Sequence, residues 1–213
     1  SNLAFITNTN TKTSGIVLPL AISFFTFQQI AYLVDLGKNK ISTPAFGNYF
    51  LFVSFFPQLI AGPIVRCQRI IPQIVKGSLG QFSRETFWVG LCLFSFGLFK
   101  KTCLADGIQP LANKIFSAAQ NGTILSFTEA WTGATAFGLQ IYFDFSAYSE
   151  MALGLSLFFG LRLPSNFNSP YKATSIIDFW RCWHITLSEF LRDYLYKPLG
   201  GNRSGIIQAI VNI

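Results

Sequence analysis

Long apolar blocks separated by short polar turns dominate this sequence. Four of them, over residues 18–34, 46–61, 86–99 and 127–160, contain few or no charged side chains. The hydrocarbon core of a bilayer is about 30 Å thick, so a helix needs about 20 mostly apolar residues to cross it. The pattern therefore predicts an all-α protein whose helices cross or enter a membrane.

Prolines interrupt the end of the second block. Pro57 and Pro63 would each break a straight helix there. Broken backbone at membrane depth persists only where protein buries it or where it lines a wet cavity. We therefore expect a re-entrant element over residues 56–63.

The third and fourth blocks predict two further helices. The third is expected to end at Lys100-Lys101, followed by a loop with turn-prone Asp106-Gly107 and Asn121-Gly122. The fourth would be about 50 Å long as one helix, at roughly 1.5 Å per residue. That length exceeds one span, so it predicts a tilted helix, a helix kinked near Gly138, or two elements.

Residues 176–197 have the spacing of one more helix. Ser175 and Asp178 resemble a capping box at its start, and Pro198 ends it. Six side chains, including the only histidine, share one stripe at helical spacing: Ile177, Trp180, Trp183, His184, Leu187 and Leu191. The charged residues elsewhere around this helix exclude a lipid-facing span, so we expect it at the membrane interface or among other helices.

Composition supports a membrane protein and excludes several other classes. Hydrophobic residues make up 51% of the chain and charged residues 12%, about half the charged fraction of soluble domains. The net charge is +7, but basic residues lie at the ends of apolar blocks, so we expect no nucleic-acid partner. The four cysteines lack metal-site spacing, and no Walker or dinucleotide motif is present. We expect neither a metal nor a bound cofactor.

We interpret residues 1–213 as one transmembrane domain, a polytopic helical bundle with re-entrant and interfacial helices. The chain starts at Ser1, its only methionine is Met151, and residues 205–213 read as the start of another apolar helix. We therefore expect an interior piece of a larger protein, incomplete at both ends.

The basic residues also predict an orientation. With spans at 18–34, 46–62 and 85–99, and with 127–160 crossing once, eleven basic residues fall on one side and five on the other. The first side receives Lys12, Arg66, Arg69, Lys76, Arg84, Arg162, Lys172, Arg181, Arg192, Lys197 and Arg203, and the second receives Lys38, Lys40, Lys100, Lys101 and Lys114. Positive residues favour the cytoplasmic side, so we expect the first side, which includes the His184 segment, to be cytoplasmic.

His184 is the foremost candidate for chemistry, because ionisable groups within a membrane are costly and mark functional sites. A neutral imidazole, with an unperturbed pKa of about 6.5, can accept the proton of a hydroxyl that attacks an acyl carbon. The alternative is a buried histidine that is hydrogen-bonded to a carbonyl or carboxylate and holds helices together. The residues alone favour neither.

Other polar residues favour structural interpretations. Asp144 and Glu150 are six residues apart, which separates them by roughly 120° on a helix and argues against an acid/base pair. We expect Asp144 to pair with a cation on another helix. Ser146 and Ser149 lack the Gly-x-Ser-x-Gly elbow of a nucleophile and are expected to serve helix packing.

Four segments, taken together and in order, resemble the membrane-bound O-acyltransferase family in its alginate O-acetyltransferase-like branch. They are residues 18–35, residues 56–64 with Arg66, IYFDFSAYSEMA (141–152) followed by Asn166-Phe167 and Pro170, and DFWRCWHITLS (178–188) with PLGGNR (198–203). Each segment alone is a weak signal. Their combination over nearly the whole chain is specific.

The resemblance implies transfer of an acyl group, acetyl above all, to hydroxyls of an extracytoplasmic polysaccharide. It implies a tunnel in a bacterial cytoplasmic-membrane protein that crosses the bilayer several times. The implied partners are a thioester donor such as acetyl-CoA or a carrier protein inside, a periplasmic or extracellular acetylation protein, the polysaccharide and membrane lipid.

The resemblance also suggests site residues. The family's main catalytic histidine lies in a later Leu-Trp-His-Gly segment that this sequence lacks, so His184 is expected to be auxiliary and the fragment alone inactive. The candidates for the substrate or donor tunnel are Trp180, Trp183, Arg181, Asp144, Tyr148, Pro63 and Arg66. Arg181, Arg192 and Arg203 can instead extend to lipid headgroups, as interface arginines more often do.

Two alternatives remain. D-alanyl transfer to teichoic acid is one, because those transferases resemble the chain in the tryptophan–histidine segment. A polytopic transporter or flippase is the other, because broken helices and buried charge also mark transport pathways. An inverted repeat would favour the transporter, and the four segments show none.

Overall fold

The computed structural model of the protein describes residues 22–60, 62–81 and 83–201. Over these residues every regular element is helical, so the all-α prediction is confirmed for them. In chain order the elements are α2 (Ile22–Gly37), α3 (Phe46–Ser54), the 3-10 turn η1 (Phe56–Gln58), α4 (Cys67–Val75), α5 (Arg84–Phe99), the π-helical η2 (Lys100–Ala105), α6 (Asp106–Gln120), α7 (Phe127–Phe158), the 3-10 turn η3 (Pro170–Lys172), α8 (Ile176–Cys182), α9 (Ile185–Phe190) and the π-helical η4 (Leu191–Tyr196). Residues 18–21 of the first predicted block, and the expected last helix at 205–213, lie outside the described residues.

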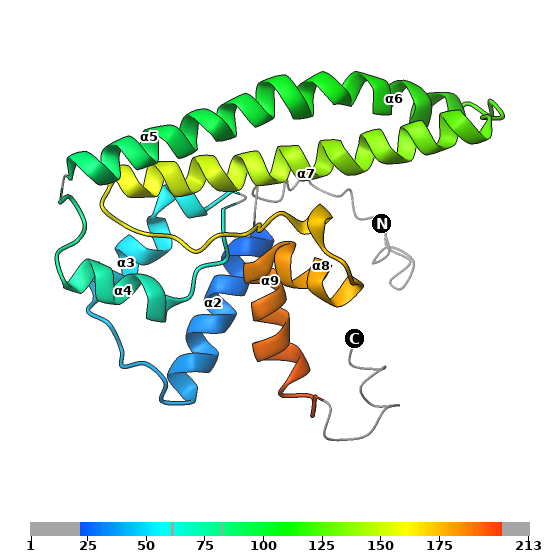
Figure 1. Cartoon of the computed structure of the whole chain (residues 1–213). Coiled ribbons are helices and arrows are strands. Elements are labelled where there is room, and N and C mark those ends of the chain that lie inside the picture. Colours follow the sequence, from blue (N-terminus) through cyan, green and yellow to red (C-terminus); the bar gives the residue numbers. More distant parts are fainter. Residues whose placement is uncertain (1–21, 61, 82, 202–213) are drawn as a thin grey trace, which may run out of the picture.

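A long helical hairpin forms one layer of the molecule (Figure 1). α5, η2 and α6 join without a break from Arg84 to Gln120, and α7 runs back along them. The predicted helix end at Lys100-Lys101 and the predicted turn at Asp106-Gly107 are therefore wrong, because both pairs lie inside the continuous helix. The turn at Asn121-Gly122 is confirmed, with Gly122 in the left-handed region at φ 81°.

Ion pairs explain why the two lysines do not end the helix. The Nζ of Lys100 lies 2.5 Å from a carboxylate oxygen of Glu150, and that of Lys101 lies 2.6 Å from one of Asp144. Both carboxylates belong to α7. The prediction that Asp144 pairs with a cation on another helix is confirmed.

α7 is one continuous helix of 32 residues, so the fourth block does not form two elements. A capping box fixes its start: the Glu129 amide donates to Ser126 Oγ, and the Ser126 amide donates to Glu129 Oε2. Glycines allow α5 and α7 to pack closely. A Cβ atom on Gly90 would lie 2.8 Å from the carbonyl oxygen of Gly154.

The hairpin presents large apolar side chains to its surroundings. Among them are Trp88, Phe96, Phe99, Phe116 and Trp131, each about half exposed or more. In the described part of the chain one helix, Arg84–Gln120, is long and apolar enough to cross a membrane, and only 11% of its most apolar stretch is buried. Contiguous exposed apolar surface of this kind marks contact with a membrane or another protein.

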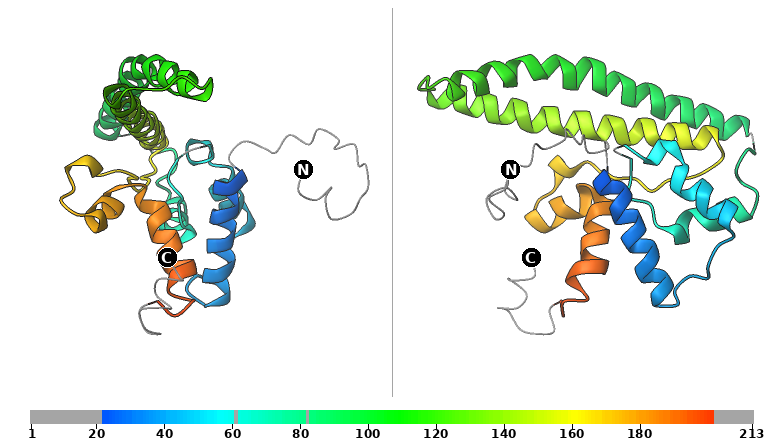
Figure 2. Two further views of the ribbon diagram at one scale, coloured as in Figure 1. Left: turned by 90° about the vertical axis from the view of Figure 1, so that its right-hand side faces the viewer. Right: turned by 180° about the vertical axis from the view of Figure 1, so that it is seen from behind.

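The remaining helices form a second layer against the hairpin, with α2 and α9–η4 side by side and crossing the direction of the hairpin (Figure 2). The buried core of this layer joins α3, α4 and the segment after α7. Its fully or nearly fully buried residues are Phe52, Val65, Cys67, Ile70, Ile74, Leu161 and Leu163.

The chain reverses between α3 and α4. α3 has nine residues, about 13 Å of helix, and ends at Ser54, and η1 begins at Phe56 with Pro57 in its first turn. The break at these prolines confirms the interruption that the sequence predicts. It also brings the start of α4 back to the end of α2, where Gln68 Nε2 donates to Asp35 Oδ2 over 3.1 Å.

This reversal corrects the predicted orientation. The orientation count placed Lys40 and Arg66 on opposite sides of the membrane, but Lys40 approaches Asp35 (3.7 Å) beside the α4 start that follows Arg66. A nine-residue α3 is too short to cross a bilayer and separate them. Asp35 itself lies in the last turns of α2 and is only 2% exposed.

The predicted single helix over residues 176–197 is also wrong. The helix is interrupted at Trp183 and His184. His184 takes left-handed backbone angles, and α9 starts after it in a new direction. The predicted stripe is therefore split. Trp180 is 55% exposed, whereas His184 is 8% exposed. The start of this segment behaves as predicted, since Ser175 Oγ accepts from the Asp178 amide.

Candidate functional site

His184 lies at the junction between α8 and α9, facing α2 and α7. Its backbone angles are φ 42° and ψ 54°, a conformation that costs a residue other than glycine about 1–3 kcal/mol. The imidazole stacks on Phe24 of α2, with 6.1 Å between ring centroids, and meets Phe145 of α7 edge-on at 4.7 Å. Strain of this size persists only where the surroundings hold the residue firmly.

An extended segment after α7 holds this junction from one side. The Asn168 amide donates to the Cys182 carbonyl oxygen over 3.0 Å, and the Ile185 amide donates to the Asn166 carbonyl oxygen over 2.9 Å. These two hydrogen bonds flank Trp183 and His184. They fix the backbone on both sides of the left-handed residue.

A series of buried hydrogen bonds through side chains holds the junction from the other side. Thr186 Oγ1 donates to Asn166 Oδ1 over 2.6 Å and accepts from the Ile64 amide over 2.9 Å. Asn166 is fully buried and Thr186 is 3% exposed. The loop that contains the buried Pro63 is thereby connected to the first turn of α9.

The surroundings of His184 favour its neutral form. Burial lowers the pKa of His184 to about 4, and the rings that face it, Phe24 and Phe145, carry no charge. Its Nδ1 is buried and has no hydrogen-bond partner among the described residues. A buried polar atom without a partner is costly in a folded protein, so this nitrogen is available to a substrate hydroxyl.

Trp183 is the centre of an aromatic cluster beside the histidine. It stacks on Phe179 at 5.6 Å and meets Phe167 edge-on at 5.2 Å. Tyr142 and Tyr171 complete the cluster at 6.1 and 6.3 Å from the Trp183 ring. Together these rings form an aromatic wall that joins α7 to α8, and Trp183 in this wall is the residue directly before His184.

The other sequence candidates divide between the junction and the surface. Trp180 is exposed, and the Arg181 side chain is 73% exposed and paired with Asp178 of its own helix. Asp144 faces Lys101 of the hairpin, on another side of α7 from Phe145. Tyr148 follows Phe145 by nearly one turn of α7 and is half-buried. The structure groups Pro63, Trp183 and His184, and it places Trp180, Arg181 and Asp144 elsewhere.

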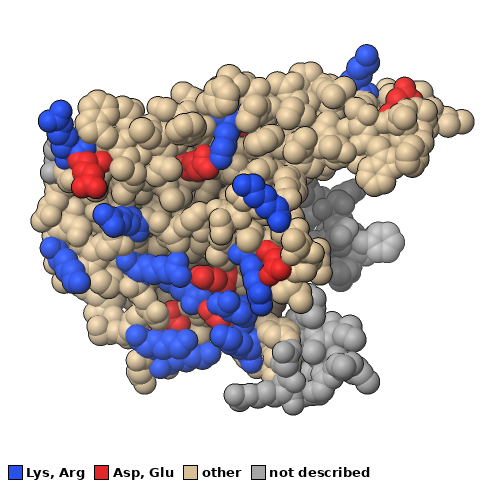
Figure 3. All heavy atoms as spheres, in the orientation of Figure 1, with Lys and Arg blue, Asp and Glu red and all other residues tan. Residues whose placement is uncertain are grey.

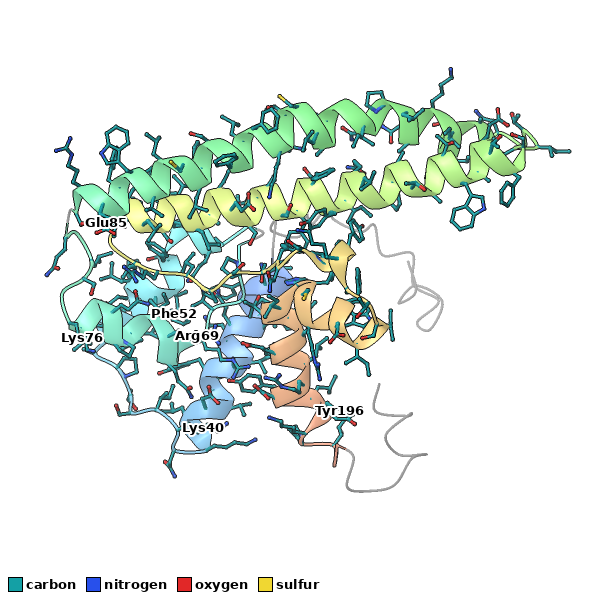
Figure 4. All side chains as sticks on the ribbon, in the orientation of Figure 1. Lys40, Phe52, Arg69, Lys76, Glu85 and Tyr196 are labelled. Carbon is teal, nitrogen blue, oxygen red and sulfur yellow. The ribbon has the colours of Figure 1, made fainter. Side chains whose placement is uncertain are left out.

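Arg66 belongs to a second polar cluster, at the far end of α9 and η4. Its guanidinium donates to Asp193 Oδ2 over 2.7 Å and to the Glu189 carbonyl oxygen over 3.1 Å, and it lies 5.1 Å from the centre of the Tyr194 ring. The Tyr194 hydroxyl donates in turn to Asp35. Lys40 and Tyr196 lie toward this same end of the molecule (Figure 4).

Basic side chains gather over this end of the protein (Figure 3). Several of them pair with the carboxylates beneath: Arg69 with Glu189 at 3.1 Å, Arg192 with Asp193 at 3.1 Å, and Lys197 with Asp193 at 2.8 Å. The sequence patterns do not predict this cluster, nor the hydrogen bonds of Asn166 and Thr186 at the His184 junction. The available signal was a polar or acidic residue next to a long apolar block, as with Asp35.

Among residues 22–60, 62–81 and 83–201, no three His, Cys, Asp or Glu side chains converge into a group that could hold a metal ion. Burial, together with the nearby charge of Asp35, raises the pKa of the Cys67 thiol to about 11. A thiol with so high a pKa is a poor nucleophile at neutral pH.

Comparison with known proteins relates this chain to acyltransferases. The family model of the membrane-bound O-acyltransferases matches residues 36–212. The chain is 47% identical over 95% of its length to a peptidoglycan O-acetyltransferase of Helicobacter pylori, and 44% identical over 93% to a probable alginate O-acetylase of Pseudomonas aeruginosa. It is 28% identical over 83% of its length to a teichoic acid D-alanyltransferase of Bacillus subtilis. The chain spans 43, 37 and 44% of these three relatives, respectively.

Proposed function

Because this chain belongs to the membrane-bound O-acyltransferase family, we propose that the protein transfers an acyl group, acetyl, to hydroxyls of an extracytoplasmic polysaccharide. The observation that carries the proposal is the 42–47% identity to O-acetyltransferases over 93–95% of the chain. The membership also weighs against the transporter alternative. A thioester, acetyl-CoA or an acylated carrier, is the donor in this proposal.

His184 acts in this reaction as an auxiliary residue. The acceptor hydroxyl oxygen attacks the thioester carbonyl carbon, the new carbon–oxygen bond forms, and the carbon–sulfur bond breaks. The hydroxyl proton passes to a base, and the departing thiolate takes up a proton. A neutral His184 with an unpartnered Nδ1 can accept or relay the hydroxyl proton. Positioned acid–base groups contribute about 10²–10⁴-fold to such reactions.

The neighbouring residues receive roles that follow from their positions. Trp183, in the aromatic wall beside His184, and Pro63, in the loop tied to α9, line the tunnel. Arg181 and Trp180, both exposed, meet the donor or lipid headgroups. Arg66, Asp144 and Tyr148 support the helices around the tunnel, with Asp144 paired to Lys101.

The protein crosses the bacterial cytoplasmic membrane several times. The basic end formed by Lys40, Arg66, Arg69, Arg192 and Lys197 faces the cytoplasm, because positive residues accumulate there. Phe56–Gln58 and the loop after it form the re-entrant element, which starts and finishes on this side. The thioester donor or its carrier meets the cytoplasmic side, and an extracytoplasmic acetylation protein receives or completes transfer outside.

The test is deletion of the gene for the full-length protein and measurement of esters on the cell envelope. Mild alkali releases ester-linked acetate from peptidoglycan and exopolysaccharide, and D-alanine from teichoic acid. The proposal predicts that acetate from one polysaccharide falls to background and returns with the wild-type gene, whereas ester-linked D-alanine is unchanged. Loss of D-alanine instead would support D-alanyl transfer, which the Bacillus subtilis relative favours as the second candidate. No change in either ester would contradict both.

A further inference from the structure

We propose that Asn166 and Thr186 are positioning residues that hold His184 in its left-handed conformation, and so direct its imidazole toward the acceptor hydroxyl. This inference rests on the proposed function. Neither side chain touches the reacting atoms in this account. Their effect passes through the backbone that directly follows His184.

The first argument is conformational. His184 carries backbone angles that are unfavourable for a residue with a side chain, and it does so between α8, of seven residues, and the continuous run of α9 and η4, of twelve. Helices this short have little stability of their own in water. The conformation of the junction must therefore come from contacts outside α8 and α9.

The second argument is that these contacts converge on Asn166. Its main-chain carbonyl oxygen accepts a hydrogen bond from the amide of Ile185, the residue after His184. Its side-chain Oδ1 accepts one from the hydroxyl of Thr186, one residue further. One asparagine therefore restrains two successive residues of the first turn of α9. Because Asn166 is fully buried, water cannot replace these bonds if they break.

The third argument is that Thr186 has a second attachment. Its Oγ1 accepts from the Ile64 amide, so the hydroxyl is both donor and acceptor in a buried chain from residue 64 through 186 to 166. This joins three segments far apart in the sequence at the first turn of α9. Valine has nearly the shape of threonine but can make neither bond, whereas serine can make both.

The expected consequence is a loss in the chemical step rather than in substrate binding. A displacement of about 1 Å at a reacting group can reduce a rate about 10²-fold. We expect Thr186→Val to lower kcat of the full-length enzyme about 10- to 100-fold with KM changed less than about threefold. Thr186→Ser is expected to restore at least about half of the wild-type kcat, because the hydrogen bonds return.

The experiment measures acyl transfer by the purified full-length protein in lipid vesicles, with Asn166→Ala, Thr186→Val, Thr186→Ser and His184→Ala side by side. The matched control is Ser156→Ala, which removes a buried hydroxyl that donates to the Leu153 carbonyl oxygen within its own helix. Thermal unfolding of each variant reports the state of the fold.

The outcomes separate this inference from the proposed function. A kcat loss in Thr186→Val at nearly wild-type KM, rescued by Thr186→Ser and absent from Ser156→Ala, supports the positioning role. Wild-type kcat in Thr186→Val and Asn166→Ala, with His184→Ala inactive, overturns the positioning role and leaves the proposed function intact. Equal losses in Thr186→Val and Thr186→Ser also overturn it. Full activity in His184→Ala contradicts the role of His184 itself.

Discussion

The Tyr194 hydroxyl donates a 2.6 Å hydrogen bond to Asp35 Oδ2 and so joins η4 to the last turns of α2. Asp35 is 2% exposed, and Gln68 of α4 donates to the same oxygen. Burial and the hydrogen bond to Asp35 raise the pKa of Tyr194, so the phenol stays protonated and remains a donor. One carboxylate therefore links three elements that lie on the same side as the basic cluster.

Removal of the Tyr194 hydroxyl should destabilise the protein. In Tyr194→Phe the buried carboxylate loses its shortest hydrogen bond, for which we expect a cost of about 1–3 kcal/mol in the free energy of unfolding. The control is Tyr171→Phe, which removes a 2.7 Å bond to the Gly138 carbonyl oxygen from a half-exposed side chain. Thermal unfolding in detergent compares the two. Equal effects would show that the Asp35 contact has no special weight.

Asp193 should make stability depend on pH in the acid range. Burial alone would raise its pKa, but hydrogen bonds from Arg192, Lys197 and Arg66 outweigh burial and hold the pKa well below the usual value of about 3.9. A carboxyl with a lower pKa in the folded state contributes stability above its unfolded pKa, and this is lost as pH falls through the folded pKa.

The measurement is the unfolding temperature from pH 7 to pH 2.5, for wild type and Asp193→Asn. We expect the variant to be less stable at pH 7 and to lose less between about pH 4 and pH 2.5. Asp178→Asn is the control, because its partner Arg181 is exposed and the pair should contribute little. Parallel pH curves for wild type and Asp193→Asn would refute the assignment.

Close packing of the hairpin should make Gly90 intolerant of a side chain. In Gly90→Ala the new Cβ would lie 2.8 Å from the Gly154 carbonyl oxygen and 3.1 Å from Phe158, so α5 and α7 must separate. We expect a destabilisation of about 1–3 kcal/mol. Gly107→Ala, also helical but with no atom within 4 Å of its Cβ, should stabilise by up to about 1 kcal/mol. The measurement is thermal unfolding in detergent. Equal changes in the unfolding temperature of the two variants would contradict the close packing at Gly90.

The corrected orientation predicts which positions share a side of the membrane. Lys38, after α2, and Lys76, after α4, should both be cytoplasmic, although the sequence count separates them. The test introduces Lys38→Cys or Lys76→Cys into a protein from which the exposed Cys92 and Cys103 have been removed. Each new cysteine should react with an impermeant maleimide only after the cytoplasmic side of the membrane has been made accessible to the reagent. Reaction of the two from opposite sides would show that α3 crosses the membrane.

Much of the fold follows from the apolar pattern, and the errors have physical causes. The helix starts at Ser126 and Ser175, the break at Pro57 and the turn at Asn121-Gly122 depend on local residues. Lys100-Lys101 suggested a helix end because the sequence does not display the carboxylates of α7 that neutralise them. Local helix propensity cannot predict ion pairs between residues that are far apart in the sequence.

His184 stays a prediction as a site residue, and the backbone conformation at this position could not be predicted from the sequence. His184 was singled out as the only histidine of a membrane-like chain, and helical spacing then placed it inside one helix. The left-handed break comes from Asn166, which lies 18 residues earlier, and from Ile64, more than 100 residues earlier. Periodicity carries no information on hydrogen bonds across such separations.

The most direct test of the account is acetyl transfer by the purified full-length protein in vesicles, with wild type and His184→Ala measured against the Ser156→Ala control. The substrates are an acetyl thioester and a cell-wall polysaccharide, and the readout is alkali-labile acetate on the polymer. The account predicts that His184→Ala lowers kcat about 100-fold while the protein remains folded and Ser156→Ala stays within about twofold of wild type. Wild-type transfer by His184→Ala would contradict it.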